Sequence, residues 1–221
     1  MLNVLKSIDW SQPSLWVAIA SICFNPLYWN IVARQEYKNK ILTKLAGGNR
    51  YLACYALGLS IFVLGIVRDH LYQKALADQP TEPILRYTEF KFLAAGLFAV
   101  GSTLVGTSMW ALGVTGTYLG DYCGILMDHK VESFPFNVTD SPMYTGSTMC
   151  FLATALWYQS PAGLVLTALV YVVYQVALSY EDPFTGAIYA KRDEERKNKV
   201  ANAEPSGSSS AVRSRAAAKE L

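Results

Sequence analysis

Four long stretches of this chain carry no charged side chain. They cover residues 10–33, 51–67, 92–120 and 141–180. About 20 consecutive apolar residues cross the ~30 Å hydrocarbon core of a bilayer. The first and third stretches are therefore each long enough for one transmembrane helix, the second is just short, and the fourth could hold two. A water-soluble helical protein would need polar stripes along these stretches, and the sequence shows none.

The composition supports a membrane location, because 52% of the residues are hydrophobic and only 16% are charged. An ordinary soluble domain carries about 25% charged residues. Lipid offers the backbone no hydrogen-bond partners, so membrane-spanning segments close their hydrogen bonds within helices or barrels. The sequence predicts an all-α fold, a polytopic integral membrane helical bundle with about four transmembrane helices.

The ends and interruptions of these helices follow from a few residues. Pro26 interrupts the first stretch and removes a backbone donor, which predicts a kinked or re-entrant first segment. The second stretch is expected to end at a conventional membrane interface formed by Arg68 and Asp69. The fourth stretch is expected to divide at Ser160 and Pro161.

The chain is expected to form one membrane-embedded domain over residues 1–193, followed by a disordered tail over residues 194–221. The tail is rich in serine and charged residues and includes Pro205 and Gly207, a composition typical of disorder. The first apolar stretch lacks a small-residue cleavage motif, so it is expected to be retained and not removed as a signal peptide.

Lysine and arginine favour the cytosolic side of a membrane. The tail is rich in both, whereas residues 121–140 contain only Lys130, so these two segments are expected on opposite sides with the tail in the cytosol. Residues 34–50 conflict with this assignment, because a count of four spans places them outside although they are basic: they contain Arg34, Lys38, Lys40, Lys44 and Arg50.

Several classes of site are not indicated. His70 and His129 are far apart and have no partner at i+3 or i+4, so no metal site is predicted. Basic residues form no stripe interleaved with aromatics, so nucleic acid is not an expected partner. Self-association is left open. The cysteines have no C-x-x-C spacing and are expected to be free thiols: Cys23, Cys54, Cys123 and Cys150.

Two carboxylates, Glu181 and Asp182, follow directly on the last apolar stretch, which ends at Tyr180. Carboxylates at the end of a membrane helix are costly, and the helix dipole disfavours them at a C-terminus. Two interpretations follow: the pair holds a cationic ligand, or it pairs with the basic residues at 191–192. Small residues around Gly101 have a similar ambiguity, since they allow either close helix packing or close approach of a ligand.

Four blocks of the sequence resemble the phospholipid N-methyltransferases, most closely the fungal phosphatidyl-N-methylethanolamine N-methyltransferases. They are "FNPLYWNIVARQEYKNK", "GIVRDHLYQKALADQPT", "GTYLGDYCGILMDHKVESFPFNVTDSPMYTGST" and "YEDPFTGAIYAKRD". The resemblance covers residues 7–193. It implies an enzyme that methylates phosphatidyl-N-methylethanolamine and its dimethyl form to phosphatidylcholine, with phosphatidylethanolamine as a further candidate acceptor and no metal.

The same resemblance implies S-adenosylmethionine as the methyl donor and two motifs that contact it. The Gly-x-Gly motif falls on Ala99, Val100 and Gly101, with alanine in place of the first glycine, which puts the role of position 99 in doubt. The acidic pair falls on Glu181 and Asp182. A Pro-x-Tyr-x-Gly element, shared with isoprenylcysteine carboxyl methyltransferases, adds further donor-site candidates: Pro142, Tyr144 and Gly146.

Methyl transfer to an amine requires alignment of donor and acceptor at about 3–3.5 Å and an unprotonated nitrogen. Asp121 is the candidate proton acceptor, with Glu132 as a second. Aromatic rings could surround the methylated cation, although interfacial tyrosines also serve as membrane anchors. The candidate rings are Tyr118, Tyr122, Phe134, Phe136 and Tyr144.

The resemblance places the enzyme in the endoplasmic reticulum membrane, with a mitochondrial membrane as a second candidate. Two alternatives are weaker. An isoprenylcysteine-type carboxyl methyltransferase would carry Arg-His before Pro142, where this chain has Asp140 and Ser141. A transporter would show broken helices in both halves, and only the first stretch is interrupted, which leaves a non-catalytic scaffold as the other rival.

Overall fold

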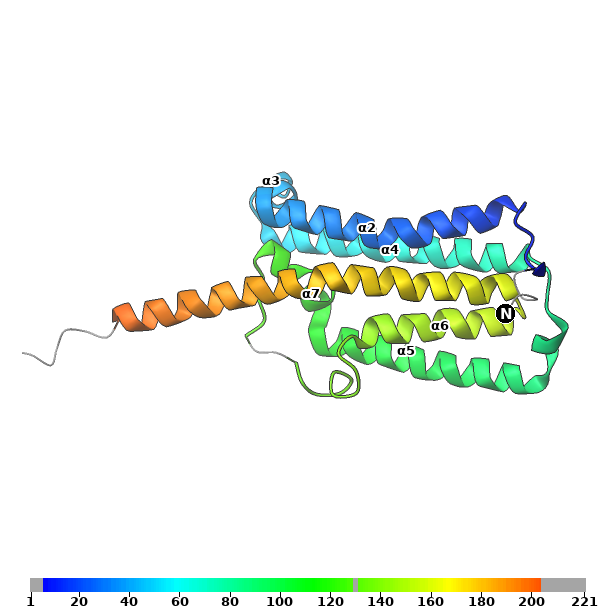
Figure 1. The fold of residues 1–221 in the computed structure, drawn as a ribbon. Coiled ribbons are helices and arrows are strands. Elements are labelled where there is room, and N and C mark those ends of the chain that lie inside the picture. The colour runs from blue at the N-terminus through cyan, green and yellow to red at the C-terminus, as the bar shows by residue number, and fades with distance from the viewer. Residues whose placement is uncertain (1–5, 129–130, 204–221) are drawn as a thin grey trace, which may run out of the picture. The chain divides into compact units, whose positions relative to one another are not determined.

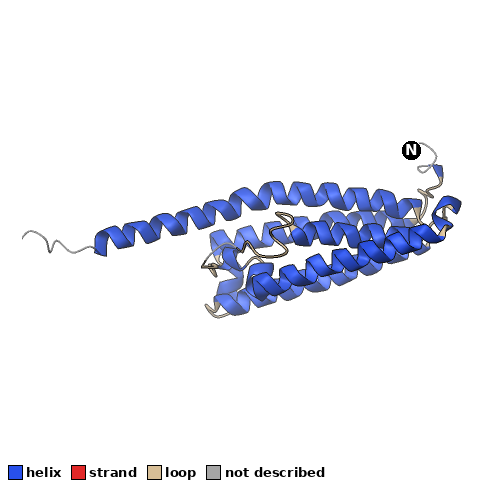
Figure 2. Cartoon of the chain, turned by 90° about the horizontal axis from the view of Figure 1, so that it is seen from below, coloured by secondary structure: helices blue, strands red, loops and turns tan. Residues whose placement is uncertain are grey.

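The computed structural model describes residues 6–128 and 131–203, and this part of the chain consists of helices and loops without a strand (Figure 2). The prediction of an all-α fold is therefore confirmed. The long helices are α2 (Pro13–Asn39), α4 (Arg50–Ala77), α5 (Thr88–Thr117), α6 (Pro142–Trp157) and α7 (Pro161–Ala203). Three short ones are α3 (Ile41–Leu45), η1 (Pro83–Arg86) and η2 (Gly120–Cys123).

Four helical segments are long and apolar enough to cross a bilayer: α2, α4, α5 extended through η2, and α7. The chain is thus a multi-pass membrane protein. Residues 1–182 form one compact unit and residues 183–221 a second. Within the first unit the five long helices run alternately in opposite directions (Figure 1). We call its two ends the α3 end and the η1 end, after the short helices found there.

The core of the first unit is built where α2, α4, α6 and α7 meet. Its buried side chains include Ile22, Tyr72, Phe151 and Leu166. Gly163 allows α7 to approach α6, because a Cβ atom there would lie only 2.8 Å from that of Ala155. Large apolar side chains elsewhere on the bundle are exposed, as expected for helices that face lipid.

The first segment does not turn back at Pro26. Helix α2 has 27 residues in all and continues through this proline. It therefore has the length of a full span and is not re-entrant. The neighbouring amide of Asn25 is buried and donates to the Leu64 carbonyl oxygen of α4 at 3.1 Å. This hydrogen bond ties the middle of α2 to the adjacent helix.

Two expected helix ends lie inside helices instead. Helix α4 continues beyond Arg68 and Asp69 to Ala77, and the Arg68 side chain is turned into the bundle. Helix α7 continues through Pro183 to Ala203, so Glu181 is not at a helix C-terminus and the expected dipole penalty does not apply. The helix also covers residues 194–203, which were expected in the tail; residues 204–221 lie outside the described part.

Helix α6 explains the conflict over the basic loop. It has 16 residues, fewer than a typical span, yet it returns the chain from the α3 end to the η1 end. Residues 34–50, the described parts of residues 118–141 and the point where the first unit ends all lie at the α3 end (Figure 1). The expectation that residues 121–140 lie opposite the chain's exit was wrong, because the count of four spans omitted α6.

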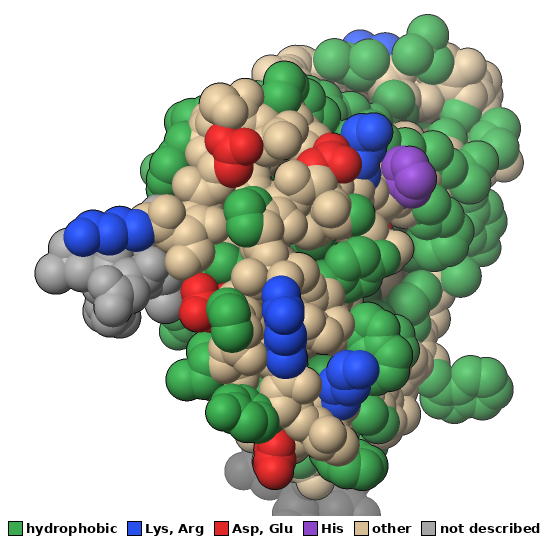
Figure 3. All heavy atoms as spheres, turned by 90° about the vertical axis from the view of Figure 1, so that its right-hand side faces the viewer, with side chains coloured by type: hydrophobic (Ala, Val, Ile, Leu, Met, Phe, Trp, Pro, Cys, Tyr) green, Lys and Arg blue, Asp and Glu red, His purple; other side chains and the backbone are tan. Residues whose placement is uncertain are grey.

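The opposite end carries side chains of both charges. Figure 3 faces the η1 end and shows acidic and basic side chains interspersed on it, with apolar side chains around them. The α3 end carries the basic residues of the loop between α2 and α4 together with four carboxylates of the segment after α5: Asp121, Asp128, Glu132 and Asp140.

Candidate functional site

The Glu181 carboxylate accepts hydrogen bonds from side chains of two other helices. Its side chain lies in α7 and is buried, with 9% of its surface exposed. Oε1 accepts hydrogen bonds from Trp29 Nε1 and Asn30 Nδ2, each at 2.7 Å, and Oε2 accepts one from the Tyr144 hydroxyl at 2.6 Å. One carboxylate thus joins three helices.

The sequence places these donors through simple local rules. Trp29 and Asn30 are adjacent in α2, and Asn30 also donates to the Pro26 carbonyl oxygen one turn earlier at 3.1 Å. Pro142 is buried in the first turn of α6, where its missing N–H costs nothing, so that Tyr144 follows within the same turn. Trp29 and Asn30 therefore reach Glu181 from α2, and Tyr144 reaches it from the start of α6.

The site is rich in acceptors and lacks a positive partner. Among the described residues no ion pair to Glu181 is found. The Asn30 Oδ1 atom beside it is buried without a hydrogen-bond donor. Arg34 is used differently: its guanidinium donates to the Tyr180 carbonyl oxygen at 2.7 Å and lies 5.9 Å from the centre of the Tyr180 ring. A cationic group with N–H donors would satisfy both the carboxylate and the free amide oxygen.

A second layer of polar side chains supports Tyr144. Its ring packs edge-on against Tyr174, with ring centres 4.9 Å apart and planes at 80°. The Tyr174 hydroxyl accepts a hydrogen bond from Arg68 Nη1 at 2.7 Å and lies 3.4 Å from Ser147 Oγ. These contacts extend the polar network from α7 and α6 to α4.

The predicted acidic pair divides into two unlike environments. Glu181 points into the bundle, whereas Asp182 is exposed. Neighbouring residues of a helix point about 100° apart, so one helix turn cannot direct both carboxylates at the same buried group. The structure therefore brings Glu181, but not Asp182, into contact with Tyr144.

The three residues of the predicted donor motif, at positions 99–101, each lie in a different environment. A Cβ atom on Gly101 would lie 2.6 Å from the Gly146 carbonyl oxygen, and one on Gly146 would lie 2.6 Å from the Gly101 carbonyl oxygen. These two candidate residues thus meet each other, and they let α5 and α6 cross in backbone contact. Val100 is half exposed, and Ala99 points elsewhere.

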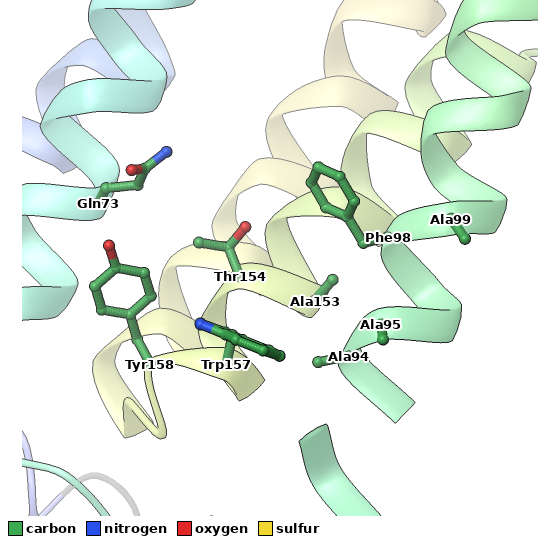
Figure 4. A pocket seen from close by; sticks show the side chains of 9 residues that line it. All are labelled: Gln73, Ala94, Ala95, Phe98, Ala99, Ala153, Thr154, Trp157 and Tyr158. Atoms are coloured by element: carbon green, nitrogen blue, oxygen red, sulfur yellow. The ribbon is translucent and has the colours of Figure 1, made fainter. Parts of the chain in front are cut away.

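Ala99 lines a cavity of about 460 Å³ towards the η1 end (Figure 4). The other walls are mostly apolar and come from α5, the last turns of α6 and one residue of α4: Gln73, Ala94, Ala95, Phe98, Ala153, Thr154, Trp157 and Tyr158. Tyr144 lies in the first turn of α6, whereas these residues lie in its last turns, so Ala99 and the Glu181 carboxylate belong to different levels of the bundle.

The candidates for proton transfer lie at the α3 end. Asp121 is half-buried in η2, which packs against α2, α4 and α5, and Glu132 is exposed in the following loop. The candidate rings have separate surroundings. Tyr118 packs across Gly58 of α4, where an added Cβ would lie 3.0 Å from its ring, and Tyr122 is buried in η2. The loop rings are half-buried or exposed: Phe136 and Phe134.

Sequence reasoning missed Trp29, Asn30 and Arg68. A polar amide inside an apolar stretch was the available signal for Asn30, and Arg68 was misread because charge at the end of an apolar run usually marks an interface. His129 lies outside the described residues. Within the described ones no three metal-binding side chains come together.

Comparisons with known proteins match this chain over most of its length. The family model described as phospholipid methyltransferase matches residues 90–192. The phosphatidyl-N-methylethanolamine N-methyltransferase of Neurospora crassa is 58% identical over 88% of this chain and 91% of its own. That of Saccharomyces cerevisiae is 51% identical over 89% and 95%. The phosphatidylethanolamine N-methyltransferase of Rattus norvegicus is 47% identical over 86% and 94%. No solved structure matches.

Proposed function

Because this chain belongs to the phospholipid methyltransferase family, we propose that it methylates phosphatidyl-N-methylethanolamine and its dimethyl form to phosphatidylcholine. The fungal relatives named for this activity are 51–58% identical to it, and the rat relative named for phosphatidylethanolamine is 47% identical. The order of identity favours the monomethyl and dimethyl lipids as the main acceptors, with phosphatidylethanolamine as a weaker one.

The donor site rests on two observations. The Glu181 carboxylate has no ion pair among the described residues, and the neighbouring Asn30 Oδ1 atom is buried without a hydrogen-bond donor. S-adenosylmethionine supplies an electrophilic methyl group on a sulfonium and also carries an ammonium. A buried carboxylate with no cation, next to a buried acceptor with no donor, fits the binding of such an ammonium. Trp29 and Tyr144 orient the carboxylate by holding one oxygen each.

The other predicted donor residues act on this site through packing. Gly101 and Gly146 set the distance between α5 and α6, and buried Pro142 starts α6, so together they determine where Tyr144 reaches Glu181. Ala99 and Val100 are outside this arrangement, and Asp182 contributes a solvent-facing charge. In this proposal Glu181 alone of the acidic pair binds the donor directly.

The acceptor amine must lose a proton before it can attack, and burial at the interface favours its neutral form. Asp121 remains the proposed proton acceptor, with Glu132 as the alternative, since both lie at the α3 end, as Glu181 does. Tyr144 and the loop rings at 134 and 136 could face the methylated cation there, and the exposed Phe134 also suits membrane anchoring.

The basic loop between α2 and α4 favours a cytosolic α3 end. With that orientation the donor site faces the compartment that contains S-adenosylmethionine, and the chain leaves the first unit on the cytosolic side. We propose the endoplasmic reticulum as the membrane, with a mitochondrial membrane as the second candidate.

The activity is tested with purified protein in lipid nanodiscs, labelled S-adenosylmethionine, and each of the unmethylated, monomethyl and dimethyl lipids in turn. We expect label in the products of the monomethyl and dimethyl lipids and less with phosphatidylethanolamine. Absence of lipid-linked label from all of these would refute the proposal. Label on a prenylcysteine substrate alone would instead support the carboxyl methyltransferase alternative.

The donor site is tested by binding of S-adenosylmethionine to Glu181→Gln, which keeps the shape of the side chain and removes its charge. Loss of one charge-assisted interaction corresponds to at least about a tenfold higher Kd. Glu89→Gln is the matched control, because Glu89 is an exposed carboxylate in the first turn of α5 at the other end. Equal affinity of both variants would place the donor elsewhere.

A further inference from the structure

Arg68 is a buried cation in a membrane-spanning helix, and the reaction proposed above makes no use of it. It lies well inside α4, and 9% of its surface is exposed. A charged side chain at such depth is costly and marks a functional residue by default, with its partner to be identified. Here the partners are known.

The Arg68 guanidinium is held on three sides. Nε and Nη2 donate to Asp69 Oδ1 at 3.0 and 2.9 Å, which balances its charge. Its Cζ atom lies 4.9 Å from the centre of the Phe151 ring, a cation–π contact with α6. Nη1 donates to the Tyr174 hydroxyl of α7 at 2.7 Å. The guanidinium thus directs its Nε and Nη2 fork at Asp69 and holds Tyr174 with the remaining Nη1 donor.

Tyr174 connects this cation to the donor site. Its ring packs edge-on against the ring of Tyr144, whose hydroxyl donates to Glu181 Oε2. A tyrosine side chain has two main torsions, so fixing the ring of Tyr174 restricts those that Tyr144 can adopt beside it. The position of the hydroxyl on Glu181 therefore depends on a guanidinium two contacts away.

We propose that Arg68 is a positioning residue for the methyl-donor site, acting through Tyr174 and Tyr144 on the Glu181 carboxylate. This inference rests on the proposed role of Glu181 and extends it to α4. Arg68 holds the carboxylate in the orientation in which Oε1 faces Trp29 and Asn30. Its own charge is balanced by Asp69, so it supports Glu181 without pairing with it.

Tyr72 shows what a purely structural polar group in the same helix looks like. It is buried one turn after Arg68. Its hydroxyl donates to the Phe151 and Gly163 carbonyl oxygens of α6 and α7 and lies 3.1 Å from the Thr167 hydroxyl. Its ring packs edge-on against Phe151, with ring centres 4.6 Å apart. The hydroxyl of Tyr72 is thus engaged within the core, whereas the hydrogen bond from Arg68 to Tyr174 leads through Tyr144 to Glu181.

The test measures the Kd of S-adenosylmethionine and its KM and kcat for Tyr174→Phe and Arg68→Lys in nanodiscs. Tyr174→Phe keeps the ring and the Arg68–Asp69 pair and removes the hydroxyl that accepts from Arg68 and lies near Ser147 Oγ. We expect a Kd about tenfold higher for Tyr174→Phe and about threefold higher for Arg68→Lys, with kcat at saturating donor within about twofold of wild type. Tyr72→Phe is the matched control and is expected to lower stability while leaving the Kd unchanged.

A double-mutant cycle separates positioning from general damage. If Arg68 and Tyr174 act through Tyr144, then Tyr174→Phe has little further effect on the Kd in a Tyr144→Phe background. Additive losses, a wild-type Kd for Tyr174→Phe, or an equal loss for Tyr72→Phe would each overturn the proposal. Failure of the donor site itself gives a different result, namely a wild-type Kd for Glu181→Gln.

Discussion

Two glutamates of this protein are buried near the α3 end, and their surroundings differ in kind. Glu36 is fully buried and accepts hydrogen bonds from the backbone N–H groups of Leu42 and Thr43, at 2.6 and 3.2 Å, and from the Thr43 hydroxyl. Glu181 also accepts three hydrogen bonds, but from side chains of α2 and α6 that are far from it in sequence. Both carboxylates have three hydrogen-bond donors, but only the donors of Glu36 are close to it in sequence.

The comparison shows that burial of a carboxylate does not by itself identify a binding site. The partners of Glu36 lie six and seven residues ahead, beyond Lys40, which turns the chain with a φ of 55° between α2 and α3. Glu36 therefore caps the N-terminus of α3, and the groups that donate to it belong to the local backbone and side chain of that helix. Glu181 depends on three helices and lies beside an acceptor without a donor, which is the arrangement of a site prepared for a ligand.

The largest expected difference comes from removing Glu36. Glu36→Ala leaves two backbone N–H groups without their acceptor, so the free energy of unfolding should fall by about 3 kcal/mol, while the Kd for S-adenosylmethionine stays within about twofold. Unfolding in detergent micelles and donor binding measure the two quantities. A large loss of donor affinity in a folded Glu36→Ala protein would remove the distinction between the two glutamates.

Asn30→Ala probes the acceptor beside Glu181. The substitution removes both the free Oδ1 and the Nδ2 donor to the carboxylate, so the Kd for S-adenosylmethionine should rise about tenfold. Asn25→Ala provides a control in the same helix, because the Asn25 amide donates to a backbone carbonyl oxygen of α4 and not to Glu181. Equal donor affinity of these two variants would argue against a role for Oδ1.

Trp29→Phe should have a smaller effect. It removes one N–H donor from Glu181 Oε1 and keeps an aromatic ring, so the Kd should rise about fivefold. The matched change is Trp16→Phe, because Trp16 Nε1 donates to the exposed Trp10 carbonyl oxygen near the start of α2. Isothermal titration of both variants with the donor decides whether the orientation of the carboxylate matters.

Asp182→Asn should have the smallest effect. Asp182 is exposed although it adjoins Glu181, so we expect the Kd for the donor to change less than about twofold. Comparison with Glu181→Gln under the same conditions measures how unequal the pair is. If Asp182→Asn weakened binding as much as Glu181→Gln, the acidic pair would act as a unit, as the sequence motif alone suggests.

The sequence revealed the fold class well, because long charge-free stretches leave few alternatives to membrane helices. It placed the break at Ser160 and Pro161 correctly, where α6 gives way to α7. It failed at Arg68, since an arginine at the edge of an apolar run gives no sign of whether its side chain turns towards water or into the bundle. Only the tertiary partners Tyr174 and Phe151 decide that.

The site was half visible in the sequence. Glu181 was predicted as a site residue because a carboxylate next to an apolar stretch is costly. Tyr144 was predicted as part of the Pro-x-Tyr-x-Gly element. That the two would meet at 2.6 Å depends on α6 crossing α5 at Gly101 and Gly146, a packing detail that single residues do not encode. Trp29 and Asn30 had no motif at all, because their role arises from a neighbouring helix.

The shortness of α6 has a consequence for the lipid around it. Sixteen residues at 1.5 Å each span about 24 Å, several ångströms less than the ~30 Å hydrocarbon layer. A bilayer adapts to such a mismatch by dimpling inwards beside the short element. Headgroups next to the first turn of α6, which carries Tyr144, would then sink towards the bundle's polar interior. The protein would in this way bring a lipid amine down to buried side chains without lifting the lipid out of its leaflet.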